Sequence, residues 1–228
     1  MTRLTLAGLL GTFSVLLVQW GAHLNTVEAL LPFWTGFAAC IGSLAYLLNL
    51  PELLGKSQGT THPIATVLLL PFFFVVRGAW IARFKLSREA PCNEIVAGLY
   101  IGRRPVEGEL PHDVTFVVDL TSEFDEVLSI REANLYRNLP TLDGSVPPNR
   151  RDFDALVEEV SAYPKSVYIH CAYGHGRAAL LASAVLLHRG LVSDAHEAAA
   201  RLRAIRPKVR MSRDQRAWLR SRQVPRRS

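Results

Sequence analysis

The chain contains few cysteines and few charged residues. Its 228 residues include only three cysteines, Cys40, Cys92 and Cys171, which is too few and an odd number for a disulfide-stabilised scaffold. No two of them form a Cys-x-x-Cys pair, which argues against a zinc ribbon or a thioredoxin-type site. Charged residues make up 20% and hydrophobic residues 49% of the chain, a composition that excludes disorder for most of it. The length allows one or two domains with a hydrophobic core.

Positive charge is concentrated at the end of the chain. Residues 1–82 carry three basic and two acidic residues, residues 83–200 carry 12 and 17, and residues 201–228 carry 11 and one. A nucleic-acid-binding domain is expected to have its basic patch on a folded face, often with aromatic residues for stacking. Here the excess is in an Arg-rich tail, and the other end of the chain is hydrophobic. This pattern favours a membrane surface over nucleic acid as the partner.

Three apolar segments in residues 1–82 predict an all-α transmembrane anchor. The expected spans are about residues 4–22, 29–50 and 63–82. A bilayer needs about 20 apolar residues per helix, which the second segment has by itself. The third segment reaches this length only if the Arg77 side chain extends to the membrane interface. Two alternatives stay open here: a signal peptide for the first segment, or a buried helical domain for all three.

Basic residues near the ends of the spans predict the orientation. Arg83, Lys85 and Arg88 follow the third span, whereas only Arg3 precedes the first. Because cytoplasmic flanks carry the excess of Lys and Arg, the N-terminus is expected outside and the rest of the chain in the cytoplasm. The sequence therefore predicts an integral membrane protein with a cytoplasmic C-terminal domain.

Residues 83–228 show the alternation of strands and helices that is typical of an α/β domain with a central sheet flanked by helices. Short runs rich in β-branched residues predict strands at 94–101, 114–120, 134–138 and 166–170. Helical spacing of apolar residues predicts helices at 150–163, 178–189, 193–205 and 213–222. Ser193 is the expected N-cap of the third helix.

The strongest chemical signal is residues 170–177, His-Cys-Ala-Tyr-Gly-His-Gly-Arg. They follow a predicted strand and precede a predicted helix, so they form a loop whose backbone N–H groups can bind an anion. Gly174 and Gly176 allow the backbone angles that such a loop needs. Arg177 adds a planar fork for two phosphate oxygens. The same N–H groups would stabilise a Cys171 thiolate, which could then act as a nucleophile.

This stretch resembles the His-Cys-x5-Arg signature of the cysteine-dependent protein tyrosine phosphatase superfamily, and it looks most like the compact dual-specificity branch. The resemblance covers about residues 94–220 and includes GLYIGRRP at 98–105 and VVDLTSE at 117–123. It implies a dual-specificity phosphatase-like fold and a phosphocysteine intermediate on Cys171. It also implies a phosphate-binding loop made of Ala172, Tyr173, Gly174, His175, Gly176 and Arg177. No metal or cofactor is expected, because Arg177 and the N–H groups stabilise the transferring phosphoryl group.

The reaction needs a second group, a carboxylic acid that protonates the leaving oxygen. In the family this Asp lies upstream of the nucleophile on a loop often flanked by Pro. Asp143, in LPTLDGSVPP and 28 residues before Cys171, fits that position. The alternative is an ordinary turn residue, because Asp-Gly is a turn dipeptide. Asp119 and Asp125 are rivals, although the motif around Asp119 looks structural and Asp125 could cap a helix.

Three further residues around the loop have expected roles. His170 is predicted to orient the loop through hydrogen bonds rather than to transfer protons. His175 either contacts the substrate or faces solvent. The family usually has Ser or Thr after the Arg, and its hydroxyl eases departure of the cysteine. This chain has Ala178 there. Phosphate capture is expected to be intact, whereas the turnover rate stays open.

The sequence thus predicts a membrane-anchored phosphoric monoester hydrolase that acts on phosphotyrosine, phosphoserine or phosphothreonine in proteins. One alternative is a lipid phosphatase for phosphatidylglycerophosphate or an inositol phospholipid. Another is a catalytically weak, phosphate-binding pseudophosphatase. The expected partners are a phosphorylated protein or phospholipid substrate and the membrane, and the sequence indicates no oligomeric state.

Overall fold

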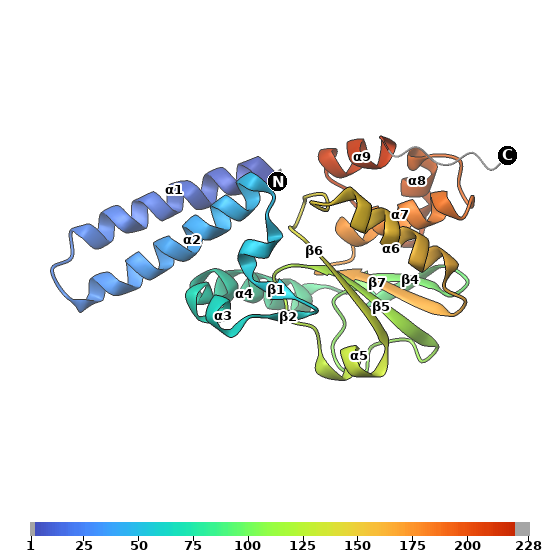
Figure 1. The fold of residues 1–228 in the computed structure, drawn as a ribbon, viewed down its shortest axis with the longest axis horizontal. Coiled ribbons are helices and arrows are strands. Elements are labelled where there is room, and N and C mark those ends of the chain that lie inside the picture. Colours follow the sequence, from blue (N-terminus) through green and yellow to red (C-terminus); the bar gives the residue numbers. More distant parts are fainter. Residues whose placement is uncertain (1–2, 222–228) are drawn as a thin grey trace. The chain divides into compact units, whose positions relative to one another are not determined.

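The computed structural model describes residues 3–221 of the chain. These residues form two compact units. Within this range the N-terminal unit consists of residues 3–88 together with Ser122–Asp125, and the C-terminal unit consists of Glu89–Thr121 and residues 126–221. Figure 1 shows an all-helical arrangement for most of the first unit and a sheet with helices for the second.

Two long apolar helices dominate the N-terminal unit. They are α1 (Arg3–Ala22) and α2 (Leu30–Leu48), which is extended at its start by the short helix η1 (Val27–Ala29). The Ser14 hydroxyl donates to the Gly36 carbonyl at 2.7 Å, so small residues bring the two backbones close together. The large apolar side chains are mostly on the outside, and they include Leu9, Phe13 and Leu16.

The expectation of three spans is wrong. Among residues 3–221, only Arg3–Ala22 and Val27–Leu48 are long and apolar enough to cross a membrane, a property shared by core helices and signal sequences. The third apolar segment is divided into α3 (Pro63–Leu68) and α4 (Leu70–Leu86). Leu69, at φ −101° and ψ 13°, separates them. Pro71 explains the break, because it has no N–H to donate to the preceding turn.

The chain between α2 and α3 contains the short helix η2 (Pro51–Leu54) and a small hairpin of β1 (Lys56–Ser57) and β2 (Thr60–Thr61). The tetrapeptide Ser122–Asp125 belongs to the same unit. There Asp125 accepts a hydrogen bond from the Thr61 amide at 2.7 Å and pairs with Arg77 at 3.1 Å. Asp125 is therefore not the cap of a helix.

The C-terminal unit is built on a five-stranded sheet with the strand order β3-β4-β7-β5-β6. Its strands are β3 (Cys92–Val96), β4 (Leu99–Arg103), β5 (Val114–Thr121), β6 (Leu135–Thr141) and β7 (Ser166–Cys171). Only the β3–β4 pair is antiparallel. The single strand expected at 94–101 is wrong, because Gly98 adopts a φ of +73° and turns the chain into a hairpin.

Helices cover both faces of this sheet (Figure 1). The short helix α5 (Leu128–Ala133) packs on β5 and β6. The other face carries α6 (Arg150–Ala162), α7 (Arg177–His188), α8 (Ala195–Ile205) and α9 (Arg213–Arg220). α7 is the central helix of this layer, and every residue from Arg177 to Leu187 is buried. The α/β architecture expected from the sequence is confirmed.

The N-cap of α8 differs from the expectation by one residue. The carboxylate of Asp194, not the hydroxyl of Ser193, accepts from the amides of His196 and Glu197. Ser193 instead donates its hydroxyl to the Glu197 carboxylate at 2.7 Å. These amide donors lower the pKa of Asp194, so the cap stays charged at neutral pH.

Truncation of the central helix should destabilise the C-terminal unit. Leu181 is fully buried in the main core, so Leu181→Ala should cost about 2–5 kcal/mol by lost burial and a residual cavity. Leu191 is 42% exposed, and Leu191→Ala should change the stability by less than about 0.5 kcal/mol. Denaturant midpoints of the two variants measure the difference, and equal midpoints would contradict this account of the core.

Candidate active site

The candidate site lies where the middle strand of the sheet ends. β7 ends at Cys171 and α7 begins at Arg177, so residues 172–176 form the whole connection. The parallel strands β4, β5 and β6 end at the same edge. Ligands of open α/β sheets bind outside the carboxyl ends of such strands. The loop expected from the sequence is thus in the position where this fold binds ligands.

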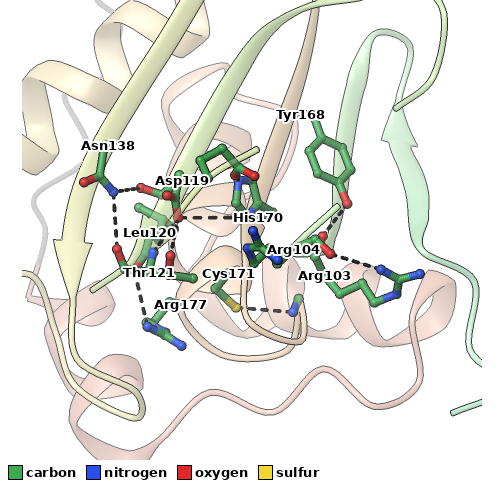
Figure 2. A network of polar contacts seen from close by, with 12 residues as sticks. Arg103, Arg104, Asp119, Leu120, Thr121, Asn138, Tyr168, His170, Cys171 and Arg177 are labelled. Carbon is green, nitrogen blue, oxygen red and sulfur yellow. Dashed lines mark hydrogen bonds and ion pairs between the residues drawn. The ribbon is translucent and has the colours of Figure 1, made fainter. Parts of the chain in front are cut away.

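The sulfur of Cys171 is buried and is held inside the loop. The side chain is 3% exposed, and its Sγ accepts a hydrogen bond from the Gly174 amide at 3.2 Å (Figure 2). An N–H that points at sulfur stabilises the negative charge of a thiolate. Cys171 therefore has the surroundings of a nucleophile, whereas Cys40 lies in α2 and Cys92 lies in β3.

The turn requires glycine at position 174. Gly174 has a φ of +74°, and a Cβ there would lie 2.4 Å from the Gly102 carbonyl carbon and oxygen. Gly102 is itself in a tight position, because its Cβ would lie 2.1 Å from the Tyr168 hydroxyl oxygen. Two glycines thus allow the loop to pass directly over the end of β4.

Arg177 is buried, and two backbone carbonyls hold its guanidinium. The residue is 1% exposed, and its Nη1 donates to the Thr141 carbonyl at 2.7 Å and to the Leu120 carbonyl at 3.4 Å. Its Nη2 lies 3.3 Å from Oδ1 of Asp143. These contacts come from the ends of β5 and β6, so the sheet orients the guanidinium beside the loop.

Asp143 is on the connection between β6 and α6, and its side chain is 59% exposed. The turn is closed by the Ser145 amide, which donates to the Leu142 carbonyl at 3.0 Å. Gln215 from α9 is buried and donates to the Ser145 carbonyl at 2.7 Å. The structure therefore brings Asp143, the candidate acid, to the guanidinium of Arg177 at the loop.

The two rival aspartates lie elsewhere. Asp119 is 1% exposed, and its carboxylate accepts from the Thr121 amide and hydroxyl, both at 2.7 Å. Tyr136 donates to the other oxygen at 2.7 Å. Burial and the charge of Asp119 raise the pKa of Tyr136 far above its usual range, so this donor keeps its proton. Asp125 pairs with Arg77 in the N-terminal unit.

The two histidines flanking the loop each pair with a carboxylate. Nε2 of His170 lies 2.8 Å from Glu126, and the side chains of both residues are fully buried. Nε2 of His175 lies 2.7 Å from Glu89 and is therefore not simply solvent-facing. Arg206, 1% exposed, also reaches Glu89 at 3.4 Å and donates to the Tyr173 carbonyl at 3.1 Å.

Sequence reasoning missed four residues that support the site: Glu89, Glu126, Arg206 and Gln215. None of them lies in the signature stretch, and each comes from a different element or connection. Arg206 directly follows a predicted helix and precedes a proline, which identifies a helix end but not a contact with the loop. Only the tertiary fold reveals that these side chains meet.

Comparisons with known proteins identify the fold. No protein-family model matches the chain, and no curated protein matches it. Among solved structures, PTPMT1 in complex with PI(5)P is 20% identical, with a TM-score of 0.51 over 57% of this chain and 92% of that one. A mutant form of Tk-PTP is 26% identical, with a TM-score of 0.50 over 56% and 91%. The human tyrosine phosphatase-like serine/threonine/tyrosine-interacting protein is 19% identical, with a TM-score of 0.50 over 57% and 94%.

These similarities cover little more than half of this chain and nearly all of each neighbour. They show a dual-specificity phosphatase-like fold, with a mixed central sheet flanked by helices. The expected α/β fold with a central sheet flanked by helices is thereby confirmed, and α1 and α2 are long and apolar enough to cross a membrane.

The geometry of the turn at Gly174 generates a test. Gly174→Ala should abolish binding of orthovanadate, because the added Cβ collides with Gly102 and distorts the loop. Gly108 is the matched control: it also has a positive φ, +80°, but an added Cβ would meet nothing within 4 Å. Gly108→Ala should cost about 1–2 kcal/mol of stability and leave binding unchanged. Calorimetric titration measures orthovanadate binding by the two variants, and thermal unfolding measures their stability. Normal binding by Gly174→Ala would contradict the proposed geometry.

Proposed function

We propose that this protein is a membrane-held cysteine phosphatase that hydrolyses phosphomonoesters through a phosphocysteine intermediate. The observation that carries the proposal is the arrangement around one sulfur. The Gly174 amide donates to the Cys171 sulfur, and the buried Arg177 lies 3.3 Å from Asp143, the candidate general acid. The dual-specificity phosphatase-like fold supports the same reaction.

In the first step the loop amides and Arg177 bind the phosphate oxygens. The Cys171 thiolate attacks phosphorus, a P–S bond forms and the P–O bond to the substrate breaks. Asp143 gives its proton to the leaving oxygen, so the product departs as a neutral alcohol or phenol. The exposure of Asp143 supports this role, because the group must reach a substrate that enters from solvent.

In the second step water attacks the phosphocysteine. Asp143, now ionised, takes a proton from this water, inorganic phosphate forms and the Cys171 thiolate leaves. The chain has Ala178, fully buried, where the resemblance leads us to expect a hydroxyl that assists this departure. Hydrolysis of the intermediate is therefore the step that we expect to be slow.

The proposed substrates are phosphotyrosine, phosphoserine and phosphothreonine in proteins. The loop supports a singly phosphorylated substrate, because positions 172, 173, 175 and 176 contain no Lys for a polyanionic head group. A phospholipid is the second candidate. Two observations favour it: PTPMT1, a neighbour in fold, was solved with PI(5)P, and α1 and α2 expose large apolar side chains.

Single substitutions test the chemistry. Cys171→Ser should reduce phosphate release by at least about 10³-fold, because a neutral hydroxyl replaces the nucleophile. Asp143→Asn should slow hydrolysis of a phosphotyrosine peptide by about 10²–10⁴-fold. The loss should be much smaller with p-nitrophenyl phosphate, whose leaving group needs little protonation. Phosphate release is also measured with three further substrates: a phosphothreonine peptide, phosphatidylglycerophosphate and inositol phospholipids. The substrate that the wild-type protein hydrolyses fastest decides between a protein and a lipid phosphatase.

Glu159→Gln is the control for these variants, because Glu159 is on α6 and pairs with Arg137 away from the loop. Equal loss with all leaving groups for Asp143→Asn would argue against the role of general acid. Binding of orthovanadate without release of phosphate from any substrate would favour the pseudophosphatase and implicate Ala178.

The membrane part of the proposal predicts that the full chain stays in the pellet after alkaline carbonate extraction. The double variant Phe13→Lys and Leu16→Lys should release it or prevent its insertion, because each lysine costs about 2.5–3.5 kcal/mol at the centre of a span. Both side chains are about half exposed in α1, at 49% and 57%, so the substitutions do not disturb a core. The double variant Ala155→Lys and Glu158→Lys, at two exposed positions of α6, is the matched control and should have no effect on membrane extraction.

A further inference from the structure

One buried side-chain amide joins the two loops of the candidate site. Gln215, in α9, is fully buried. Its Nε2 donates to the Ser145 carbonyl at 2.7 Å, and its Oε1 accepts from the Ser212 amide at 2.9 Å. The amide has its donors on one atom and its acceptor on the other, so this orientation is the one that satisfies both partners. The oxygen of Gln215 therefore caps its own helix, while the nitrogen holds a different part of the chain.

The Ser145 carbonyl belongs to the turn that carries Asp143. The Ser145 amide closes this turn by donating to the Leu142 carbonyl at 3.0 Å, and Gly144, in the third position, has a φ of +71°. Leu142 and Ser145 are buried, whereas Asp143 between them is exposed. The conformation of the turn thus decides where the exposed carboxylate points, and the two buried residues fix that conformation.

The same amide packs against the end of the phosphate-binding loop. Gly176 is the last residue before α7, and a Cβ at this position would lie 3.3 Å from Oε1 and 3.7 Å from Nε2 of Gln215. The Gln215 amide therefore fills the space beside Gly176 and reaches the Ser145 carbonyl from there. One side chain spans from the phosphate-binding loop to the turn at 142–145.

The turn is held by its main chain on both sides of Asp143. Before it, the Thr141 carbonyl accepts from Nη1 of Arg177 at 2.7 Å. After it, the Ser145 carbonyl accepts from Gln215. Arg177 is already part of the proposed phosphate site, so Gln215 is the further anchor. It acts on the Asp143 carboxylate through the main chain of the turn.

We propose that Gln215 is a positioning residue for the general acid: by bonding to Ser145 while it packs on Gly176, it sets the place of Asp143 relative to the phosphate-binding loop. The assignment rests on the proposed function, in which Asp143 protonates the leaving oxygen. Because a misplacement of about 1 Å can cost about 10²-fold in rate, loss of this anchor should appear in the step that needs the acid. Anion binding should persist, because the loop keeps the Gly174 and Arg177 contacts.

The test compares two substrates on the full chain in detergent. Gln215→Met keeps the length of the side chain and removes its polar atoms. It should slow hydrolysis of a phosphotyrosine peptide about ten- to a hundredfold, and change hydrolysis of p-nitrophenyl phosphate and the Kd for orthovanadate by less than about threefold. Gln215→Glu keeps an oxygen for the Ser212 amide and loses the N–H that donates to Ser145, so it should give the same pattern. Equal losses with both substrates, or no loss with either, would overturn the proposal.

A double variant shows whether Gln215 acts through Asp143. In the Asp143→Asn background, Gln215→Met should change the rate with the peptide by no more than about twofold, because the group that it positions is already absent. If the two losses instead multiply, Gln215 acts by another route and the proposal is wrong.

Ser212→Ala is the matched control. It removes the hydroxyl that accepts from the Gln215 amide at 3.1 Å and caps α9, but it keeps the Ser212 amide as a donor to the Gln215 side chain. It should lower the melting temperature without changing the ratio of the two substrate rates. A selective loss with the peptide in this variant would trace the effect to the end of α9 and would count against Gln215.

Hydrogen–deuterium exchange measures the position of the turn without turnover. Gln215→Met should speed exchange in residues 142–146, which include the Ser145 amide, at least about threefold, and leave β7 unchanged. Unchanged exchange in residues 142–146 would overturn the proposal. Faster exchange there in a chain that releases phosphate from no substrate would contradict the proposed function and still support the anchoring of the turn by Gln215.

Discussion

The candidate site depends on one turn, in which the chain leaves the middle strand β7 and begins α7 after only residues 172–176. The turn brings a backbone amide to the Cys171 sulfur, and it closes only because Gly174 passes over Gly102 without side chains between them. Since β7 has β4 on one side and β5 on the other, the ends of both neighbours reach the loop. Every other group of the site is positioned relative to this turn.

The charges around the turn occur in pairs that come from different elements. Arg177 lies beside Asp143, Arg206 beside Glu89, and His170 beside Glu126. Both arginines are 1% exposed and also donate to backbone carbonyls, because a buried guanidinium needs several acceptors. A pair of this kind adds little net stability, but it fixes the orientation of its members. The loop is thus oriented from three sides.

The choice of substrate does not follow from the fold. One fold can host many functions, and in the function that we propose the sheet and the loop supply only the recognition of phosphate. This chain combines such a unit with two apolar helices. In the membrane-held state that we propose, the site would meet substrates that lie at the same surface at a high effective concentration. This physical setting is equally open to lipids and to membrane-bound phosphoproteins.

The sequence by itself determined the α/β class and the loop at 170–177, and it singled out Asp143 as the candidate acid, because strand periodicity, glycine placement and motif spacing are local properties. The sequence did not reveal the hairpin turn at Gly98 or the break between two helices at Leu69, and it placed the N-cap of α8 one residue too early, at Ser193 instead of Asp194. Such boundaries depend on the conformation of single residues, which a pattern over many residues does not fix. Only the tertiary structure decided that Glu126 meets His170, because the partners of a buried charge come from distant parts of the chain that no spacing rule connects.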